Sequence, residues 1–220
     1  MEALKNKAVS DYLDDSTGEE IASSISHGIG TALAITAFVI LVVTAARKGN
    51  PWLVTSFSIY GFGLTMLFLM SVFSHAFPVG KVKRFFQVMD YSSIYLLIAA
   101  TYTPIVLGPI RGPSGWWVFG IIWGLAVCGV LFKLFLFGKF ELISLGLYIA
   151  MGWLITTTIK PLLTVVDKGF IFWILAGGIF YTSGVIFYAL KKMPYHHFVW
   201  HLFVLAGAAC HFFGFLFYIA

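Results

Sequence analysis

Long apolar stretches, separated by short breaks of charged residues, proline and glycine, dominate the pattern of this sequence. There are seven of them, at about residues 27–45, 52–75, 85–107, 116–137, 140–163, 169–190 and 197–218. Each is about 19–24 residues long, so a helix rising about 1.5 Å per residue would span a hydrocarbon core of about 30 Å. The alternation typical of membrane barrel strands is absent. Because backbone polar groups inside a bilayer need internal partners, the pattern predicts seven transmembrane helices.

The composition places these helices in a membrane rather than in water. Hydrophobic residues make up 60% of the 220 residues and charged residues only 10%, whereas soluble domains have about 45–50% apolar and about 25% charged residues. So few charges exclude a soluble enzyme, a disordered protein and a nucleic-acid-binding domain. The net charge of +5 includes no basic run on a long polar stretch, so no nucleic acid partner is expected. We predict an all-α membrane protein, a seven-transmembrane helix bundle.

Charges between the stretches predict how the chain lies in the membrane. Residues 1–22 lack the apolar region of a signal peptide, so we expect a cytoplasmic N-terminal segment there, followed by a transmembrane domain at 23–220. Of the 14 Lys and Arg residues, nine fall on the N-terminal side of the predicted helices. Positive charge accumulates on the cytoplasmic side, so the bias predicts a cytoplasmic N-terminus, an outside C-terminus and a multi-pass protein of the cell (inner) membrane. Cys128 and Cys210 lie in apolar stretches, which indicates free thiols.

Ionisable residues inside apolar spans are costly and suggest function. Asp90 is the one acidic residue well inside a predicted span, the third. His197 and His201 stand four residues apart at the start of the seventh span, so they share a helix face in a spacing that can chelate a metal. His75 lies near the end of the second span, with Ser71 one turn deeper on the same face.

Alternating helix directions bring these residues to one membrane side, where His75, Asp90, His197 and His201 share a depth. Three neutral imidazoles with an open fourth position are typical of a catalytic zinc site, where the metal makes a bound water nucleophilic. Asp90 would hold this water and accept its proton. Ser71 would hydrogen-bond a developing oxyanion or orient a ligand. The alternative is an interfacial histidine cluster without a metal.

Other polar positions leave two interpretations open. Glu20, Ser23 and His27 have the spacing of one helical face near the first span. They either orient the site from behind its ligands or cap the helix at the interface. His211 lies near mid-membrane, where it either hydrogen-bonds a neighbouring helix or lines a cavity or proton path.

Four motifs in order carry a resemblance to a known family. They are Glu20-x2-Ser23-x3-His27, Ser71-x3-His75, Met89-Asp90-Tyr91-Ser92 and His197-x3-His201. From about residue 20 to the C-terminus the chain resembles the hemolysin III family, the bacterial branch of the progestin and adipoQ receptor (PAQR) membrane proteins. The resemblance implies a Zn²⁺ ion held by His75, His197 and His201, with Asp90 acting through water near the cytoplasmic face. Ser23 departs from the family pattern, which often has asparagine there, so the hydrogen bonding around Glu20 and His27 is left open, while the zinc triad is unaffected.

The resemblance also places the chain near the alkaline ceramidases. It therefore implies a zinc-dependent intramembrane hydrolase of lipid amide (ceramide-like) or ester bonds. Two alternatives remain at this stage. One is a non-enzymatic hemolysin, pore-former or regulator of membrane properties with a structural zinc, and the other is a receptor, which the short outer loops disfavour. Membrane lipids and a zinc ion are the expected partners, and a homo-oligomer is left open.

Overall fold

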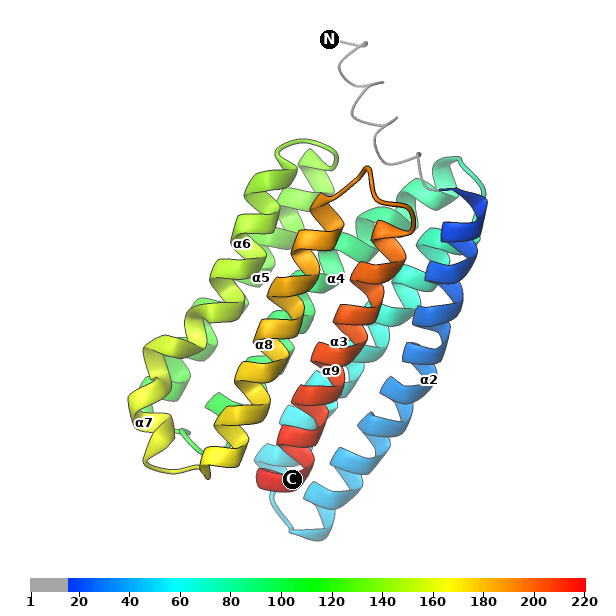
Figure 1. Cartoon of the computed structure of the whole chain (residues 1–220). Helices are drawn as coiled ribbons and strands as arrows, with labels where there is room; N and C mark the ends of the chain where they lie inside the picture. The colour runs from blue at the N-terminus through cyan, green and yellow to red at the C-terminus, as the bar shows by residue number, and fades with distance from the viewer. Residues whose placement is uncertain (1–15) are drawn as a thin grey trace.

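The computed structural model describes residues 16–220, and every regular element in this range is helical (Figure 1). The elements are α2 (Thr17–Arg47), α3 (Pro51–Ala76), α4 (Lys81–Val106), α5 (Pro113–Leu136), α6 (Glu141–Trp153), the 3₁₀ helix η1 (Leu154–Thr158), α7 (Ile159–Leu163), α8 (Lys168–Ala189) and α9 (His196–Tyr218). Since α6, η1 and α7 follow one another without a break, the described chain forms seven helical rods. The predicted all-helical fold is confirmed for this range.

Six of the seven rods are long and apolar enough to cross a membrane, so the protein is a multi-pass membrane protein. The exception is α4, which is as long as α3 but more polar. Several of its polar side chains, such as Ser92, Ser93 and Thr103, are buried inside the bundle. A helix surrounded by other helices does not need an apolar surface all round. Its crossing of the membrane stays a prediction.

Helices that follow one another in the chain pack side by side, and the last helix returns to the first. The most extensive contacts join α2 to α3, α3 to α4, α4 to α5 and α8 to α9, and α9 also packs against α2 (Figure 1). The start of α2 and the C-terminus lie at opposite ends of the bundle in this view. The end of α3 and the starts of α2, α4 and α9 therefore meet at one end, as alternating directions predict.

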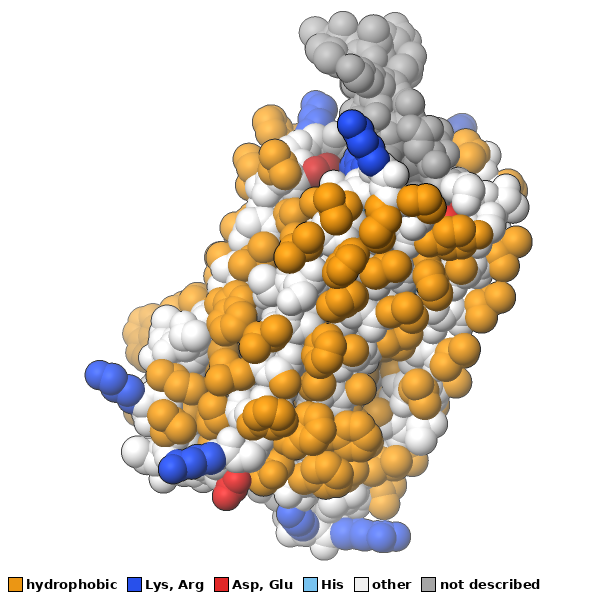
Figure 2. All heavy atoms as spheres, viewed as in Figure 1, with side chains coloured by type: hydrophobic (Ala, Val, Ile, Leu, Met, Phe, Trp, Pro, Cys, Tyr) orange, Lys and Arg blue, Asp and Glu red, His pale blue; other side chains and the backbone are white. Residues whose placement is uncertain are grey.

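The bundle exposes apolar side chains along its flanks. On α2, Ile21, Ile25, Ile29 and Leu33 recur every four residues and are 55–59% exposed, which is the pattern of one helix face. Figure 2 shows apolar side chains along the sides and Lys and Arg at the two ends. A surface of this kind suits lipid along the flanks and water at the ends.

The first helix begins earlier than its apolar stretch predicts. It starts at Thr17 rather than near residue 27, because Ser16 caps it by accepting a hydrogen bond from the Glu19 backbone N–H at 3.2 Å. Acidic residues in its first turn favour the positive end of the helix dipole. The helix thus runs through the predicted boundary at residues 22 and 23. Where the membrane begins along it stays a prediction, and residues 1–15 of the predicted N-terminal segment lie outside the described range.

The fifth predicted helix, at 140–163, is irregular in its second half. It changes from α to 3₁₀ geometry at Leu154 and resumes as α7. The Tyr102 hydroxyl of α4 enters the backbone at this point, where it accepts from the Ile155 N–H at 2.6 Å and donates to the Met151 carbonyl at 2.8 Å. A side chain inserted in this way interrupts the regular helical ladder. Pro161 adds to the irregularity, since it has no N–H to donate to the carbonyl of Thr157. Cys128 and Cys210 are both free, as expected.

Candidate metal centre

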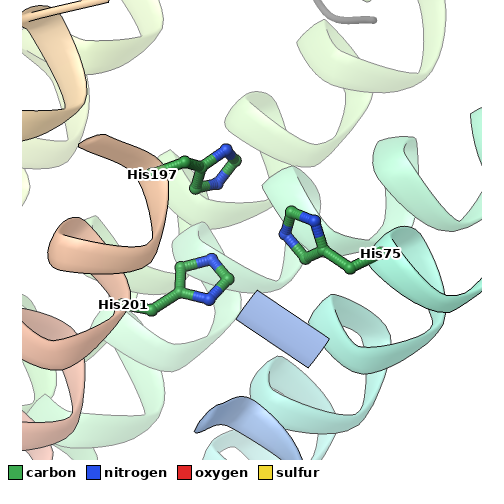
Figure 3. A group of neighbouring side chains, drawn as sticks. All are labelled: His75, His197 and His201. Carbon is green, nitrogen blue, oxygen red and sulfur yellow. The ribbon is translucent and has the colours of Figure 1, made fainter. Parts of the chain in front are cut away.

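Three histidines from two helices converge at the end of the bundle where α3 ends and α9 begins (Figure 3). His75 is in the last turn of α3, and His197 and His201 are in the first two turns of α9. The ring centroids of His75 and His197 are 4.9 Å apart, those of His75 and His201 5.0 Å, and those of His197 and His201 4.8 Å. His75 and His201 are buried.

One nitrogen of each ring lies within 4.8 Å of the corresponding nitrogens of the other two. Three nitrogens that bind one ion at about 2.0–2.1 Å lie at most about 4 Å apart. Small rotations of the side chains therefore bring all three into bonding distance. The cluster can hold a metal ion of the kind that imidazole ligands favour.

A carboxylate behind His75 determines which of its nitrogens faces the cluster. His75 Nδ1 is 2.7 Å from Glu20 Oε2, and Lys83 Nζ donates to Glu20 Oε1 at 2.7 Å. A carboxylate only accepts, so Nδ1 carries the proton of the neutral ring. His75 Nε2 is buried and has no hydrogen-bond partner among residues 16–220. An imidazole held in this way offers its other nitrogen to a metal, as is usual at metal sites.

The first turns of α2 also contact α9. Glu19 Oε1 accepts a hydrogen bond from the His197 backbone N–H at 2.8 Å. The backbone carbonyl of Ser23 is 3.4 Å from His201 Nδ1. His27 stacks on His201 with ring centroids 3.6 Å apart. Side chains and backbone groups of α2 thus contact His75 on α3 and both His197 and His201 on α9.

Asp90 lies beside the cluster on α4. Its Oδ2 accepts a hydrogen bond of 2.9 Å from the Ser74 hydroxyl on α3. Ser71, one turn before Ser74, is also buried, and it lines the same cavity as Asp90, His197 and His201. The carboxylate and the Ser71 hydroxyl therefore face the space beside the histidines.

Two hollows meet at this site. The inner cavity reaches into the bundle, and most of its wall is apolar, including Leu97, Ile98, Ile149, Leu175 and Val204. The polar vestibule lies toward the end of the bundle, and its wall includes Ser16, Glu19, Glu20, Gln87, Lys191 and Lys192. Asp90, Tyr91, Tyr188 and His197 line both hollows. The candidate metal centre lies at the junction of an apolar and a polar space.

The structure brings together the residues that the sequence singled out. His75, His197 and His201 form the cluster, Asp90 and Ser71 lie beside it, and Glu20, Ser23 and His27 lie behind it. Ser23 contributes its backbone carbonyl, while its buried hydroxyl has no partner within the described range. The roles of these residues stay predictions.

Three residues at the site were missed from the sequence: Glu19, Ser74 and Lys83. Ser74 and Lys83 stand next to or near His75 and Asp90 in the chain, but nothing in their spacing indicates which way they point. Glu19 could have been found as a second acidic residue in the first turn of a helix, beside Glu20.

We expect Glu20→Gln to weaken metal binding by about ten-fold to a hundred-fold, the usual effect of removing a carboxylate hydrogen-bonded to a metal-binding histidine. Titration against a competing chelator measures this affinity. Lys83→Met is the matched control, since it keeps the contact between Glu20 and His75, and its effect should be smaller. Unchanged affinity in Glu20→Gln would mean that the carboxylate does not orient His75.

Comparison with known proteins gives a consistent result over nearly the whole chain. Residues 16–212 match the family model described as Haemolysin-III related. The chain is 46% identical to Hemolysin-3 of Bacillus cereus over 202 residues, which cover 91% of this chain and 92% of that protein. It is 44% identical to the Hemolysin-3 homolog of Bacillus subtilis (strain 168), over 91% and 94% of the two chains. Identity to the human monocyte to macrophage differentiation factor is 30%, over 71% and 67%.

Proposed function

The chain belongs to the haemolysin-III related family, and we propose that it is a zinc-dependent intramembrane hydrolase of lipid amide (ceramide-like) or ester bonds. The observation that carries the proposal is the position of His75, His197 and His201 between the inner cavity and the polar vestibule. A lipid has its amide or ester bond at the boundary between its polar head and its apolar chain. A lipid with its chain in the cavity and its head in the vestibule would present that bond to the site.

Zinc is the metal that this donor set fits best. Three neutral imidazoles from the chain, with the fourth position left to water or substrate, are the usual ligands of a catalytic zinc ion. His75 Nε2, which is buried and has no hydrogen-bond partner in the described part of the chain, supports this fit. The His75 ring centroid is 4.9 Å from that of His197 and 5.0 Å from that of His201. When bound, zinc polarises a carbonyl group and makes a coordinated water acidic.

The side chains around the cluster would complete the reaction. Asp90 takes a proton from the attacking water, whose oxygen bonds to the carbonyl carbon. Ser71 donates a hydrogen bond to the carbonyl oxygen as negative charge develops there. The bond from the carbon to the amide nitrogen or ester oxygen then breaks, and Asp90 passes its proton to that leaving atom. Ser74 holds the Asp90 carboxylate in place through the 2.9 Å hydrogen bond.

We further propose that the N-terminus is cytoplasmic, that the C-terminus is outside and that the membrane is the cell (inner) membrane. Over the whole sequence, nine Lys and Arg residues fall on the N-terminal side of the predicted helices and five on the other side, and this bias supports the orientation. Lys81, Lys83, Arg84, Lys191 and Lys192 belong to the nine and lie at or near the helix ends that surround the site. The site would then open toward the inner leaflet.

The test is hydrolysis of a lipid panel by purified protein, with the products identified by mass spectrometry. The panel contains ceramides, other N-acyl lipids and glycerol esters. We expect release of a fatty acid from at least one class, loss of activity after prolonged chelation, and recovery with added zinc. Zinc-loaded protein that releases no fatty acid from any class would contradict the proposal.

The names of the two Bacillus relatives, Hemolysin-3 and its homolog, favour a second function, membrane lysis, in which zinc would brace α3 against α9. Leakage of dye from vesicles that contain the protein tests it. Leakage that persists in Asp90→Asn would support lysis without hydrolysis. Vesicles that stay sealed would exclude a pore.

A further inference from the structure

A second histidine position, away from the metal cluster, lies in the wall of the inner cavity. His211 is on α9, ten residues after His201, and is therefore about 15 Å farther along the helix axis. It is buried and lines the same cavity. Ionisable side chains this deep in a membrane protein are costly to place there and usually serve a function. The proposed reaction does not use this residue.

The hydrogen bond that one ring nitrogen of His211 makes decides whether the other nitrogen is a hydrogen-bond donor or acceptor. Its Nε2 is 3.2 Å from the backbone carbonyl of Ile174 on α8. Because a carbonyl only accepts, Nε2 carries the proton of an uncharged ring, and Nδ1 is left as an acceptor. Nδ1 is buried and has no partner among residues 16–220. A group that fills this position must donate a hydrogen bond.

Tyr181 on α8 supplies a second polar group at the same depth. It lines the cavity, and its ring centroid is 5.5 Å from that of His211. Its hydroxyl can both donate and accept a hydrogen bond. Gly177 and Gly207 lie against the two rings, and an added Cβ at either position would overlap with His211 or Tyr181. Close packing on both sides therefore keeps the two rings in place.

We propose that His211 and Tyr181 form a binding subsite for a hydroxyl group in the chain of the lipid, about 15 Å from the bond that is cleaved. The hydroxyl donates to His211 Nδ1 and accepts from the Tyr181 hydroxyl. An oxo group or an ether oxygen at the same carbon cannot donate, so it leaves Nδ1 without a partner. The inference rests on the proposed hydrolase function for its distance from the reacting bond, and it names hydroxylated acyl chains as the preferred class of substrate.

Matched substrates test the subsite directly. One head group carries acyl chains that are unsubstituted, hydroxylated or oxo-substituted, with the substituent moved stepwise along the chain. We expect kcat/KM for the best hydroxylated chain to exceed that for the unsubstituted chain by on the order of five- to ten-fold, the effect of one to two hydrogen bonds. The optimum should lie about 15 Å from the carbonyl carbon, and the oxo chain should show no gain. Equal rates for all three chains would overturn the subsite.

Variants assign the preference to His211. In His211→Phe, the ratio of the rates on hydroxylated and unsubstituted chains should fall to about one. In His211→Gln, an amide can still donate to the Ile174 carbonyl and accept from the hydroxyl, so much of the ratio should remain. Because the ratio is measured within each variant, a partial loss of folded protein does not affect it. A ratio unchanged in His211→Phe would refute the assignment.

Binding separates failure of the subsite from failure of the proposed function. Long-chain fatty acids with and without a mid-chain hydroxyl are added to detergent-solubilised protein, and the shift in Tm is measured. If no lipid is hydrolysed but the hydroxy acid stabilises the wild type more than the plain acid, and His211→Phe loses that difference, the subsite stands without the hydrolase. Equal shifts from both acids would overturn the subsite, whatever the activity.

Discussion

Purified His197→Ala should contain no tightly bound zinc and should have no measurable lipid hydrolysis. His197 is one of three imidazoles whose nitrogens lie within 4.8 Å of one another. With two ligands left, a zinc ion lacks the three-histidine set that holds it in catalytic sites. His75→Ala and His201→Ala should behave alike. Metal analysis of the purified variants, beside hydrolysis of the best substrate, measures both effects.

Asp90→Asn should separate metal binding from catalysis. The amide is close in size to the carboxylate and can still accept the hydrogen bond from Ser74, so the zinc content should stay near that of the wild type. An amide cannot take up the water proton, and turnover should fall by about a hundred-fold to ten-thousand-fold. The contrast with His197→Ala distinguishes a residue that binds the metal from one that moves a proton.

His196→Ala is the matched control for metal content, because this histidine adjoins His197 in the chain but does not belong to the cluster. Its zinc content should equal that of the wild type. Zinc retained in full by His197→Ala, or lost from His196→Ala, would contradict the assigned ligands. Full activity in Asp90→Asn would exclude Asp90 as the base.

A buried ion pair away from the metal centre, Lys133 with Glu141, should have a large effect on the free energy of unfolding. Lys133 Nζ on α5 donates to Glu141 Oε2 on α6 at 2.8 Å and lies 4.9 Å from the centre of the Tyr91 ring. The Lys133 side chain is 1% exposed, whereas that of Glu141 is 29% exposed. Glu141→Leu leaves the ammonium group buried without its counter-charge, which should lower the free energy of unfolding by about 3–5 kcal/mol.

Lys133→Met should be less damaging, because the carboxylate that it leaves behind can still reach water. The double variant with both substitutions should recover much of the loss, since replacing a buried pair by apolar side chains is often nearly neutral. To rank the three variants, each is heated in detergent, and the fraction of protein that stays in the folded peak on size-exclusion chromatography is measured at each temperature. If Glu141→Leu proved as stable as the wild type, the pair would not hold α5 and α6 together.

Much of the fold could be predicted from the chain alone, because a bilayer imposes simple demands. A helix needs about 20 apolar residues to cross, and seven stretches of that kind are visible in the sequence. The residues at which the helices begin and end were less predictable. The start of α2 at Thr17 depends on a cap at Ser16 and on acidic residues that no hydropathy pattern includes. Lys133 lies within the fourth apolar stretch, and nothing in that stretch indicates that its side chain is fully buried. Its partner Glu141 belongs to the next helix.

The candidate site also has features that the sequence predicts and features that it does not. Residue type, spacing and alternating helix directions were enough to place His75, Asp90, His197 and His201 at one depth. They could not show that α3 and α9, more than a hundred residues apart in the chain, contact the same face of α2. That contact depends on α9 returning to pack beside α2. The pairing of Glu20 with His75, and of Glu19 with the backbone of His197, follows from it.

The sequence by itself therefore determined that this protein lies in a membrane, that the described chain forms seven helical rods and that its polar site residues meet at one end of the bundle. Each of these depends on local length, hydropathy and helix direction. Only the tertiary structure decided which polar groups meet. Lateral packing selects the neighbours of each helix, and half a turn of rotation about the helix axis separates a side chain that faces the site from one that faces lipid. Within residues 16–220 the same packing left His75 Nε2 and His211 Nδ1 without hydrogen-bond partners. The first nitrogen supports the metal site, and the second carries the proposed hydroxyl subsite.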